Sequence, residues 1–188
     1  LMKDTPSLVD TNAGNFATLN PLYKGSLQTL SEGNLKSSKS SGTSISDVWG
    51  NFGMTSGKWY FECSVAAVAS SVYIGIGQGG GIGEPLDDLV VSPTSYSYEN
   101  GGNKRYGATS TSYGSTYTAG DVVGCSIDMD NGKIWWSKNG TWQASGNPAT
   151  GSNAAFTDLL TKGSDAFLSF SSTNGGSNSN TLNWNFGQ

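Results

Sequence analysis

The stretch from Gly120 to Gly140 constrains the fold of this chain more than any other part of the sequence. Its first half alternates apolar residues with small or polar ones, the period-two pattern of a half-buried strand. The apolar positions are Val123, Cys125, Ile127 and Met129. Asn131 and Gly132 follow, and this dipeptide favours a type I′ turn because both central residues of that turn need positive φ. The stretch therefore predicts a β-hairpin.

A two-residue turn at Asn131-Gly132 also fixes the register of the hairpin. The predicted pairs are Asp130–Lys133, Met129–Ile134, Asp128–Trp135 and Ile127–Trp136. An oppositely charged pair then flanks the turn, and the inward residues of both strands share one face.

The rest of the chain predicts an all-β protein with little helix. The sequence has 188 residues, of which 35% are hydrophobic and 27 are glycine, enough for one well-cored domain. Further alternating runs occur at 57–65, 73–77 and 182–186, and Gly, Ser and Asn separate them. Short strands joined by such turns favour an antiparallel β-sandwich or barrel.

We divide the chain into an extended N-terminal arm over residues 1–25, packed on the sandwich, and one domain over residues 26–188. Within the domain, residues 26–35 read as a hairpin around the turn Ser31-Glu32-Gly33-Asn34. Residues 36–44 are polar and read as a surface loop, and residues 156–160 as one turn of helix.

Composition excludes several classes of function. The net charge of −4 argues against nucleic acid and anionic membranes as partners. No apolar run approaches the roughly 18 residues of a membrane helix. The chain has no histidine, which removes the commonest general base and zinc ligand, and two cysteines cannot form a four-cysteine metal site. We therefore predict no catalytic residue, no metal and no cofactor.

Three weaker signals could carry chemistry but are better explained by structure. Asp128 and Asp130 could serve as paired glycosidase carboxylates or, with Asn131, as calcium ligands, yet the spacing of an EF-hand is absent. Gly75-x-Gly77-x-x-Gly80 has the letters of a dinucleotide fingerprint without the helix that it needs.

Cys63 and Cys125 both fall at inward positions of predicted strands. We favour two buried free thiols, which pack as small hydrophobic side chains. A disulfide between the sheets is the alternative.

The aromatic residues divide into core and candidate ligand-binding groups. Trp59, Trp136 and Trp184 occupy inward positions, whereas Trp135 points to the opposite face. Exposed rings beside amides and charged groups are suited to stacking on sugars while the amides bind hydroxyls. The residues that fit this description are Tyr98, Asn100, Asn103, Arg105, Tyr106, Trp142 and Gln143. The alternative is that these loop side chains only cover the end of the sandwich.

Several of these stretches together resemble the SPRY domain family. The matching segments are 57–62, 73–77, 96–107, 120–140 and the closing Asn185-Phe186-Gly187. The resemblance implies a bent sandwich of two antiparallel sheets, a concanavalin-like jelly roll, with binding on loops and no enzymatic activity. The peptide-pocket residues of animal SPRY domains are not evident here, so none is transferred.

Other stretches are similar to SPRY-type modules of tailed bacteriophages, particularly marine ones. They are 15–22, 138–143, 146–151 and 185–188. This resemblance implies a virion protein assembled in the bacterial cytoplasm, such as a tail fibre or another surface structure. Its expected partners are a host-surface glycan or protein and other virion subunits, with homo-oligomers formed through a larger chain. A purely structural or decoration domain is the alternative.

Overall fold

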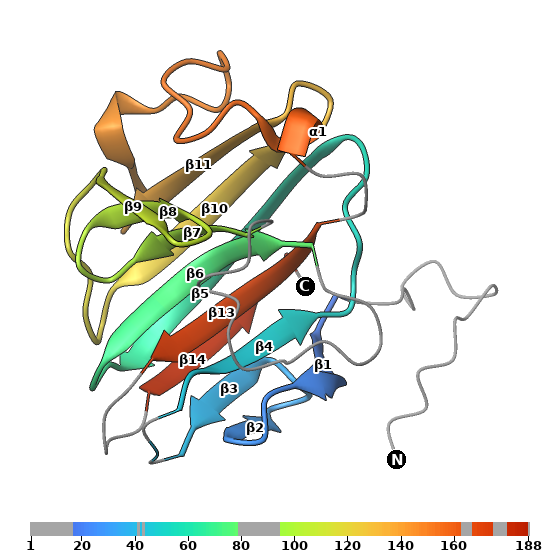
Figure 1. Ribbon diagram of the computed structural model, residues 1–188, viewed down its shortest axis with the longest axis vertical. Helices are drawn as coiled ribbons and strands as arrows, with labels where there is room; N and C mark the ends of the chain where they lie inside the picture. The colour runs from blue at the N-terminus through green and yellow to red at the C-terminus, as the bar shows by residue number, and fades with distance from the viewer. Residues whose placement is uncertain are drawn as a thin grey trace, which may run out of the picture.

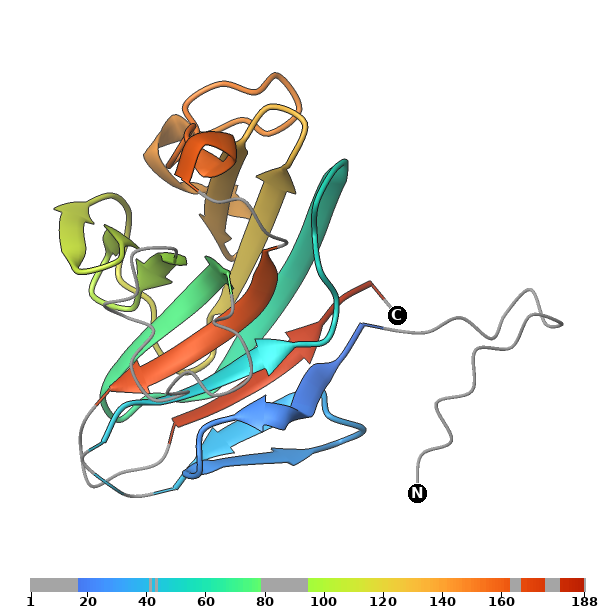
Figure 2. The ribbon, with the colours of Figure 1, turned by 45° about the vertical axis from the view of Figure 1, so that its right-hand side comes forward.

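Alternating inward and outward residues build two antiparallel β-sheets that pack face to face (Figures 1 and 2). A computed structural model describes residues 17–40, 42, 44–78, 95–162, 167–174 and 180–187. Two sequence predictions fall partly outside these residues. They are the glycine motif that ends at Gly80 and the N-terminal arm, most of which is not described. The predicted antiparallel β-sandwich is confirmed.

In the described part of the chain each sheet has seven strands, and every strand pair is antiparallel. Sheet A contains, in spatial order, β1 (Leu19–Lys24), β4 (Ser46–Gly50), β13 (Leu168–Asn174), β6 (Ser71–Gly77), β7 (Ser95–Glu99), β8 (Asn103–Tyr106) and β9 (Thr109–Ser112). Sheet B contains β12 (Thr141–Trp142), β11 (Lys133–Lys138), β10 (Val122–Asp128), β5 (Lys58–Ala67), β14 (Asn180–Asn185), β3 (Lys36–Lys39) and β2 (Gln28–Ser31).

The core lies between the sheets, where the inward side chains of both meet. Aliphatic and aromatic residues fill it, among them Ile74, Tyr98, Ile127, Trp136 and Trp184. Burying apolar area of this kind supplies the main driving force for folding. Of the three tryptophans expected in the core, Trp136 and Trp184 are buried and Trp59 is partly buried against the same cluster.

The two cysteines are part of this core. Cys63 on β5 and Cys125 on β10 are buried and free, as predicted. Both strands belong to sheet B, so the alternative of a disulfide between the sheets is wrong. Burial in apolar surroundings raises the pKa of both thiols.

The hairpin formed by β10 and β11 exists, but its predicted register is wrong. The observed pairs include Asp128 with Lys133 and Cys125 with Trp136, so the loop has four residues, Met129 to Gly132. The reason is the Asp128 carboxylate, which accepts hydrogen bonds from the backbone amides of Asp130 (3.1 Å) and Asn131 (3.0 Å). Within this loop only Gly132 has a positive φ. A type I′ turn centred on Asn131 and Gly132 would need a positive φ at both residues, so this turn is not of that type.

The observed register separates the charged side chains of Asp130 and Lys133, and each bonds to a backbone group elsewhere. Asp130 does not pair with Lys133 and instead accepts a hydrogen bond from the Gly57 amide (2.8 Å). Lys133 Nζ donates to the Gly151 carbonyl (2.9 Å). Because the register error is two residues, the inward and outward faces of both strands remain as predicted.

Three segments outside this hairpin begin or end at other residues than the sequence predicts. The hairpin expected in residues 26–35 is formed by β2 and β3, but it extends into residues 36–39, which were predicted as loop. The loop prediction failed because Lys-Ser-Ser-Lys carries no apolar signal, although Ser37 and Lys39 point inward and are buried. The helical turn is α1 (Leu159–Lys162), slightly later than expected.

Residues 19–24, assigned to the predicted arm, form the edge strand β1 of sheet A. In the described part of the chain, no helix is long and apolar enough to cross a membrane.

Candidate functional site

The outer face of sheet B carries a pair of aromatic rings, one exposed and the other partly exposed. On this face Trp142 lies opposite Ser137, Ser137 opposite Gly124, and Gly124 opposite Glu62, so one row of residues crosses four strands. Tyr60 precedes Glu62 by two residues on β5 and therefore points to the same side. The rings of Tyr60 and Trp142 meet edge to face, with centroids 6.3 Å apart at 70°.

We call this site the Tyr60–Trp142 face and define it by Tyr60, Glu62, Trp142 and Asn185. Asn185 extends the row, because it lies opposite Glu62 on β14 and is exposed. The Tyr60 side chain is 50% exposed, an unusual degree for a large ring at the middle of a sheet.

A charged hydrogen bond fixes the phenol of this face. Tyr60 donates its hydroxyl proton to Glu62 Oε1 at 2.7 Å. Partial burial of the ring, together with the Glu62 hydrogen bond and charge, raises the pKa of Tyr60 to about 12. The phenol therefore stays protonated at neutral pH, and the face presents two ring surfaces beside one carboxylate.

Trp135 lies on the same outer side but is not available at the surface. The segment 143–153 folds back over it, and the indole Nε1 donates to the Ser152 carbonyl at 2.8 Å. The ring is only 1% exposed. The expectation that Trp135 points away from the core is correct, but the loop buries it.

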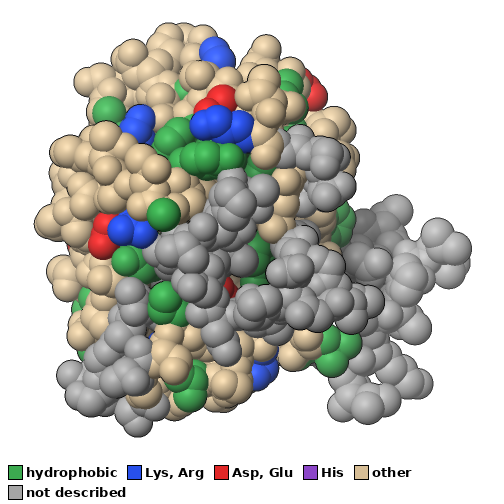
Figure 3. All heavy atoms as spheres, in the orientation of Figure 1, with side chains coloured by type: hydrophobic (Ala, Val, Ile, Leu, Met, Phe, Trp, Pro, Cys, Tyr) green, Lys and Arg blue, Asp and Glu red, His purple; other side chains and the backbone are tan. Residues whose placement is uncertain are grey.

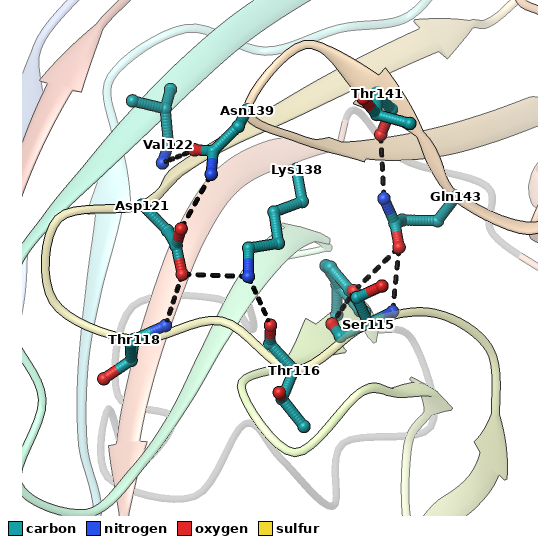
Figure 4. Close-up of polar contacts among 10 residues, drawn as sticks. Ser115, Thr116, Thr118, Asp121, Val122, Lys138, Asn139, Thr141 and Gln143 are labelled. Atoms are coloured by element: carbon teal, nitrogen blue, oxygen red, sulfur yellow. Dashed lines mark hydrogen bonds and ion pairs between the residues drawn. The ribbon is translucent and has the colours of Figure 1, made fainter.

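A hydrogen-bond network ties the loop before β10 to the end of β11 and to β12 (Figure 4). Gln143 Oε1 accepts from the Ser115 amide (2.8 Å), and its Nε2 donates to the Thr141 carbonyl (2.8 Å). The Tyr98 hydroxyl donates to the Ser115 carbonyl. Tyr98 and Gln143 are buried by this network, so both hold loops and neither offers a free group to a surface ligand.

The second half of the network is charged. Lys138 Nζ lies 3.1 Å from Asp121 Oδ2 and donates to the Thr116 carbonyl (2.8 Å). Asp121 also accepts from the Thr118 amide and from Asn139 Nδ2 (2.7 Å). These hydrogen bonds and the lysine together lower the pKa of Asp121. The network therefore holds the segment that leads to Trp142 in a defined place.

The remaining predicted ligand residues lie on or beside β8. Asn100 is occupied by the backbone, since it accepts from the Val72 amide (3.0 Å) and donates to the Ser70 carbonyl (3.4 Å). Arg105 is paired with Glu99, and Nε lies 3.6 Å from Oε2. Asn103 Nδ2 donates to the same Glu99 carboxylate at 3.5 Å.

Tyr106 belongs to an aromatic cluster and is partly buried. Its ring lies 4.9 Å from that of Tyr96, and Lys162 Nζ lies 4.0 Å from its centroid. An ion pair of 2.7 Å joins Lys162 to Asp158.

On the side of the molecule seen in Figure 3, charged side chains are few and hydrophobic ones form small separate patches. Of the predicted group, Asn100, Asn103, Arg105, Tyr106 and Trp142 keep partial exposure.

Residues 58–181 match the SPRY domain family. The chain belongs to that family. Its structure is similar to the crystal structure of the SPRY domain of human HERC1, with a TM-score of 0.71 and 17% sequence identity. The similarity covers 90% of this chain and 98% of that one, so the fold is shared over nearly the full length.

SPRY domains are protein–protein interaction modules and are generally non-catalytic. Among the residues that the structure describes, no group of three or more His, Cys, Asp or Glu side chains could hold a metal ion. In this SPRY domain the calcium alternative also meets a chemical obstacle. Both Asp128 oxygens already accept hydrogen bonds from the turn, one of them from Asn131 Nδ2 (2.9 Å).

Sequence reasoning missed Tyr60, Glu62 and Asn185 as surface residues of a possible site. The signal is present, because the alternation in residues 57–65 puts Tyr60 and Glu62 on the face opposite to Phe61 and Cys63. What the sequence did not reveal is that β5 and β12 present Tyr60 and Trp142 to the same side, since the connection depends on the pairing of four strands.

Proposed function

We propose that this SPRY domain is a non-enzymatic recognition module of a phage virion, in a tail fibre or another surface structure. It binds a host-surface protein or glycan through the Tyr60–Trp142 face. The observation that carries this proposal is the edge-to-face pair of the exposed Tyr60 and the partly exposed Trp142 beside the Glu62 carboxylate.

The chemistry of the face suits either kind of ligand. Tyrosine and tryptophan are the residues that most often dominate binding energy in protein interfaces, and both rings also stack on sugars. Glu62 supplies acceptor oxygens next to the rings, and the exposed Asn185 supplies the donors of its Nδ2, since its Oδ1 accepts a hydrogen bond from the Gly187 amide (2.9 Å). The rigid network around Asp121 and Lys138 limits the ordering cost of the segment that leads to Trp142.

The similarity of residues 15–22, 138–143, 146–151 and 185–188 to phage modules supports the proposed virion context. In this proposal the domain lies at the virion surface, where other virion subunits are its neighbours.

The test is binding of the fluorescently labelled domain to a panel of intact marine bacterial strains. We expect at least one strain to bind the wild type, and Tyr60→Ala and Trp142→Ala to reduce binding at least tenfold. Phe52→Ala is the matched control, because Phe52 is a 45% exposed ring outside the face.

Two treatments of the cells separate the ligand classes. Loss of binding after protease digestion identifies a protein, and loss after periodate oxidation identifies a glycan. If no strain binds the intact domain, the receptor hypothesis fails.

An architectural role is the second candidate, and exposed apolar side chains favour it. Leu22 on β1 is 91% exposed and Phe52 is 45% exposed, so each offers apolar area that a neighbouring subunit could cover. In this case Leu22→Ser and Phe52→Ser should reduce incorporation of the protein into particles, whereas Trp142→Ala should not.

A further inference from the structure

Among the residues that the structure describes, the two sheets have four edge strands, and these differ in whether a further strand can pair with them. The edges are β1 and β9 in sheet A, and β12 and β2 in sheet B. An edge strand presents unpaired N–H and C=O groups, so proteins usually block it with proline, charge, bulges or short length.

Three of the four edges carry such a block. β1 contains Pro21 and an irregular register between Leu19 and Lys24. β12 has only two residues. On β2, Lys24 Nζ donates to the Gln28 carbonyl at 2.7 Å, which occupies a backbone acceptor with a charged side chain.

The fourth edge, β9, is open. Its sequence Thr109-Ser110-Thr111-Ser112 has no charge and no proline, and all four residues are exposed. Within the described chain, β9 pairs only with β8, and no hydrogen bond reaches its other side. In Figures 1 and 2 the hairpin of β8 and β9 lies at the margin of the molecule.

The backbone of β9 can accept a partner strand. In an antiparallel pair, alternate residues direct both backbone groups to the partner, so about two of the four residues direct theirs outward. Serine and threonine side chains are small and polar, and threonine favours the extended conformation. The strand is therefore held extended by β8 with free groups on its outer side.

We propose that an extended segment of a partner protein adds to β9 as a further strand of sheet A. Main-chain hydrogen bonds supply the affinity in this mode, and the alternating side chains supply the specificity. This surface lies on the sheet opposite the Tyr60–Trp142 face and does not depend on the function proposed for that face.

A peptide segment fits this edge better than a second copy of the domain. Four strand residues span only about 13 Å. Pairing along so short an edge is enough to hold a peptide, but it does not by itself supply the area of about 800 Å² per partner that a stable interface between folded proteins buries. The edge is uncharged and the chain has a net charge of −4, which favours a neutral or basic segment. Thr109 and Thr111 lie on one face of β9, and β-branched residues opposite them in the added strand would form favourable cross-strand pairs.

The first experiment selects ten-residue peptides from a displayed random library on the immobilised domain. Selected peptides are then synthesised with single backbone N-methyl groups at successive positions. We expect affinity to fall at least tenfold for methylation at every second position and to change little at the positions between, because only alternate amides face β9.

The second experiment blocks the edge. Ser110→Pro and Thr111→Pro are both made, since adjacent residues point their amides to opposite sides. One variant should lose a bond to β8 and melt at a lower temperature. The other should keep the wild-type melting temperature and lose peptide binding at least tenfold.

Trp142→Ala is the control and should bind the selected peptides as the wild type does, which separates this proposal from the function of the Tyr60–Trp142 face. The proposal is overturned if no peptide is selected, if N-methylation shows no alternation, or if peptides bind the folded proline variant unchanged. Edge-to-edge dimers of the domain, seen by sedimentation and abolished by the same proline, would also overturn it in favour of a second copy.

Discussion

Gly124 leaves the space in which the phenol of Tyr60 lies. A Cβ at position 124 would come within 2.7 Å of the Tyr60 hydroxyl oxygen and 2.5 Å of Ser137 Oγ. The glycine on β10 therefore allows the tyrosine of β5 to lie across the sheet and approach Trp142.

We expect Gly124→Ala to lift the Tyr60 ring away from the sheet. The pKa of Tyr60, which partial burial and Glu62 raise to about 12, should then fall toward its ordinary value. Titration of ¹³C-labelled tyrosine by NMR measures this change. Ser64→Ala, at another outward position of β5, should leave the titration as it is, and an unchanged Tyr60 in Gly124→Ala would contradict the role given to the glycine. The stability cost should be modest, about 1–2 kcal/mol, because both contacts are to the ends of side chains.

Removal of the Asp128 carboxylate should weaken the turn between β10 and β11. Burial opposes ionisation of this group, but hydrogen bonds from the side chain and backbone of Asn131, with the charge of Lys58 and the Asp130 amide, outweigh it and lower the pKa of Asp128. We expect Asp128→Ala to cost about 2–3 kcal/mol at neutral pH. Asp130→Ala, which loses one hydrogen bond at the surface, should cost less.

The lowered pKa of Asp128 also predicts a pH dependence. Because the folded protein holds the proton less tightly than the unfolded chain, the stabilisation is present above the unfolded pKa and is lost as the pH falls through the folded one. Urea unfolding of the wild type at pH 7 and pH 3 should therefore show a loss of stability, and Asp128→Ala should show a smaller one. Equal losses in the two proteins would rule out this carboxylate as the source.

Gly75 should tolerate no side chain. A Cβ there would lie 1.9 Å from the carbonyl oxygen of Tyr96 on the neighbouring strand, and backbone cannot move aside without separating β6 from β7. We expect Gly75→Ala to lower the free energy of unfolding by about 3 kcal/mol or more. Gly101→Ala is the matched control, since its nearest neighbour would be a Glu99 side-chain atom at 3.9 Å. Chemical denaturation of both variants gives the comparison, and similar stabilities would refute the prediction.

The two cysteines should be unreactive in the folded protein. Burial raises the pKa of Cys63 and Cys125 and hides both sulfur atoms from reagent. Mass spectrometry after iodoacetamide treatment should show no addition in native buffer and two additions in denaturant without reductant. A single mass two hydrogens lower, with no addition in denaturant, would indicate a disulfide instead.

The sequence predicted the parts of the fold that rest on local pattern. Alternation of residues is strong in β5 and β10, so both strands and their inward faces followed from it. β3 was missed because its buried positions are Ser37 and Lys39, which give no apolar signal. The register of the hairpin was wrong because the side chain of Asp128, and not the Asn-Gly pair, organises the loop.

The candidate site depended on contacts that no local pattern reveals. Tyr98 and Gln143 read as loop residues with free polar groups, yet both hydrogen-bond within the loop network. Tyr60 read as an ordinary outward strand residue, and its importance came from its position relative to Trp142, which lies 82 residues later in the chain.

Two hydrogen bonds from side chains of β11 anchor the segment 143–153. The Trp135 indole donates to the Ser152 carbonyl, and Lys133 Nζ donates to the Gly151 carbonyl. Both anchors reach backbone atoms, which every amino acid possesses. The side chain of Ala149 is exposed, that of Pro148 is partly exposed, and neither contributes to an anchor. Substitutions at these two positions should therefore leave the backbone of the segment in place, so the same framework can display different side chains there.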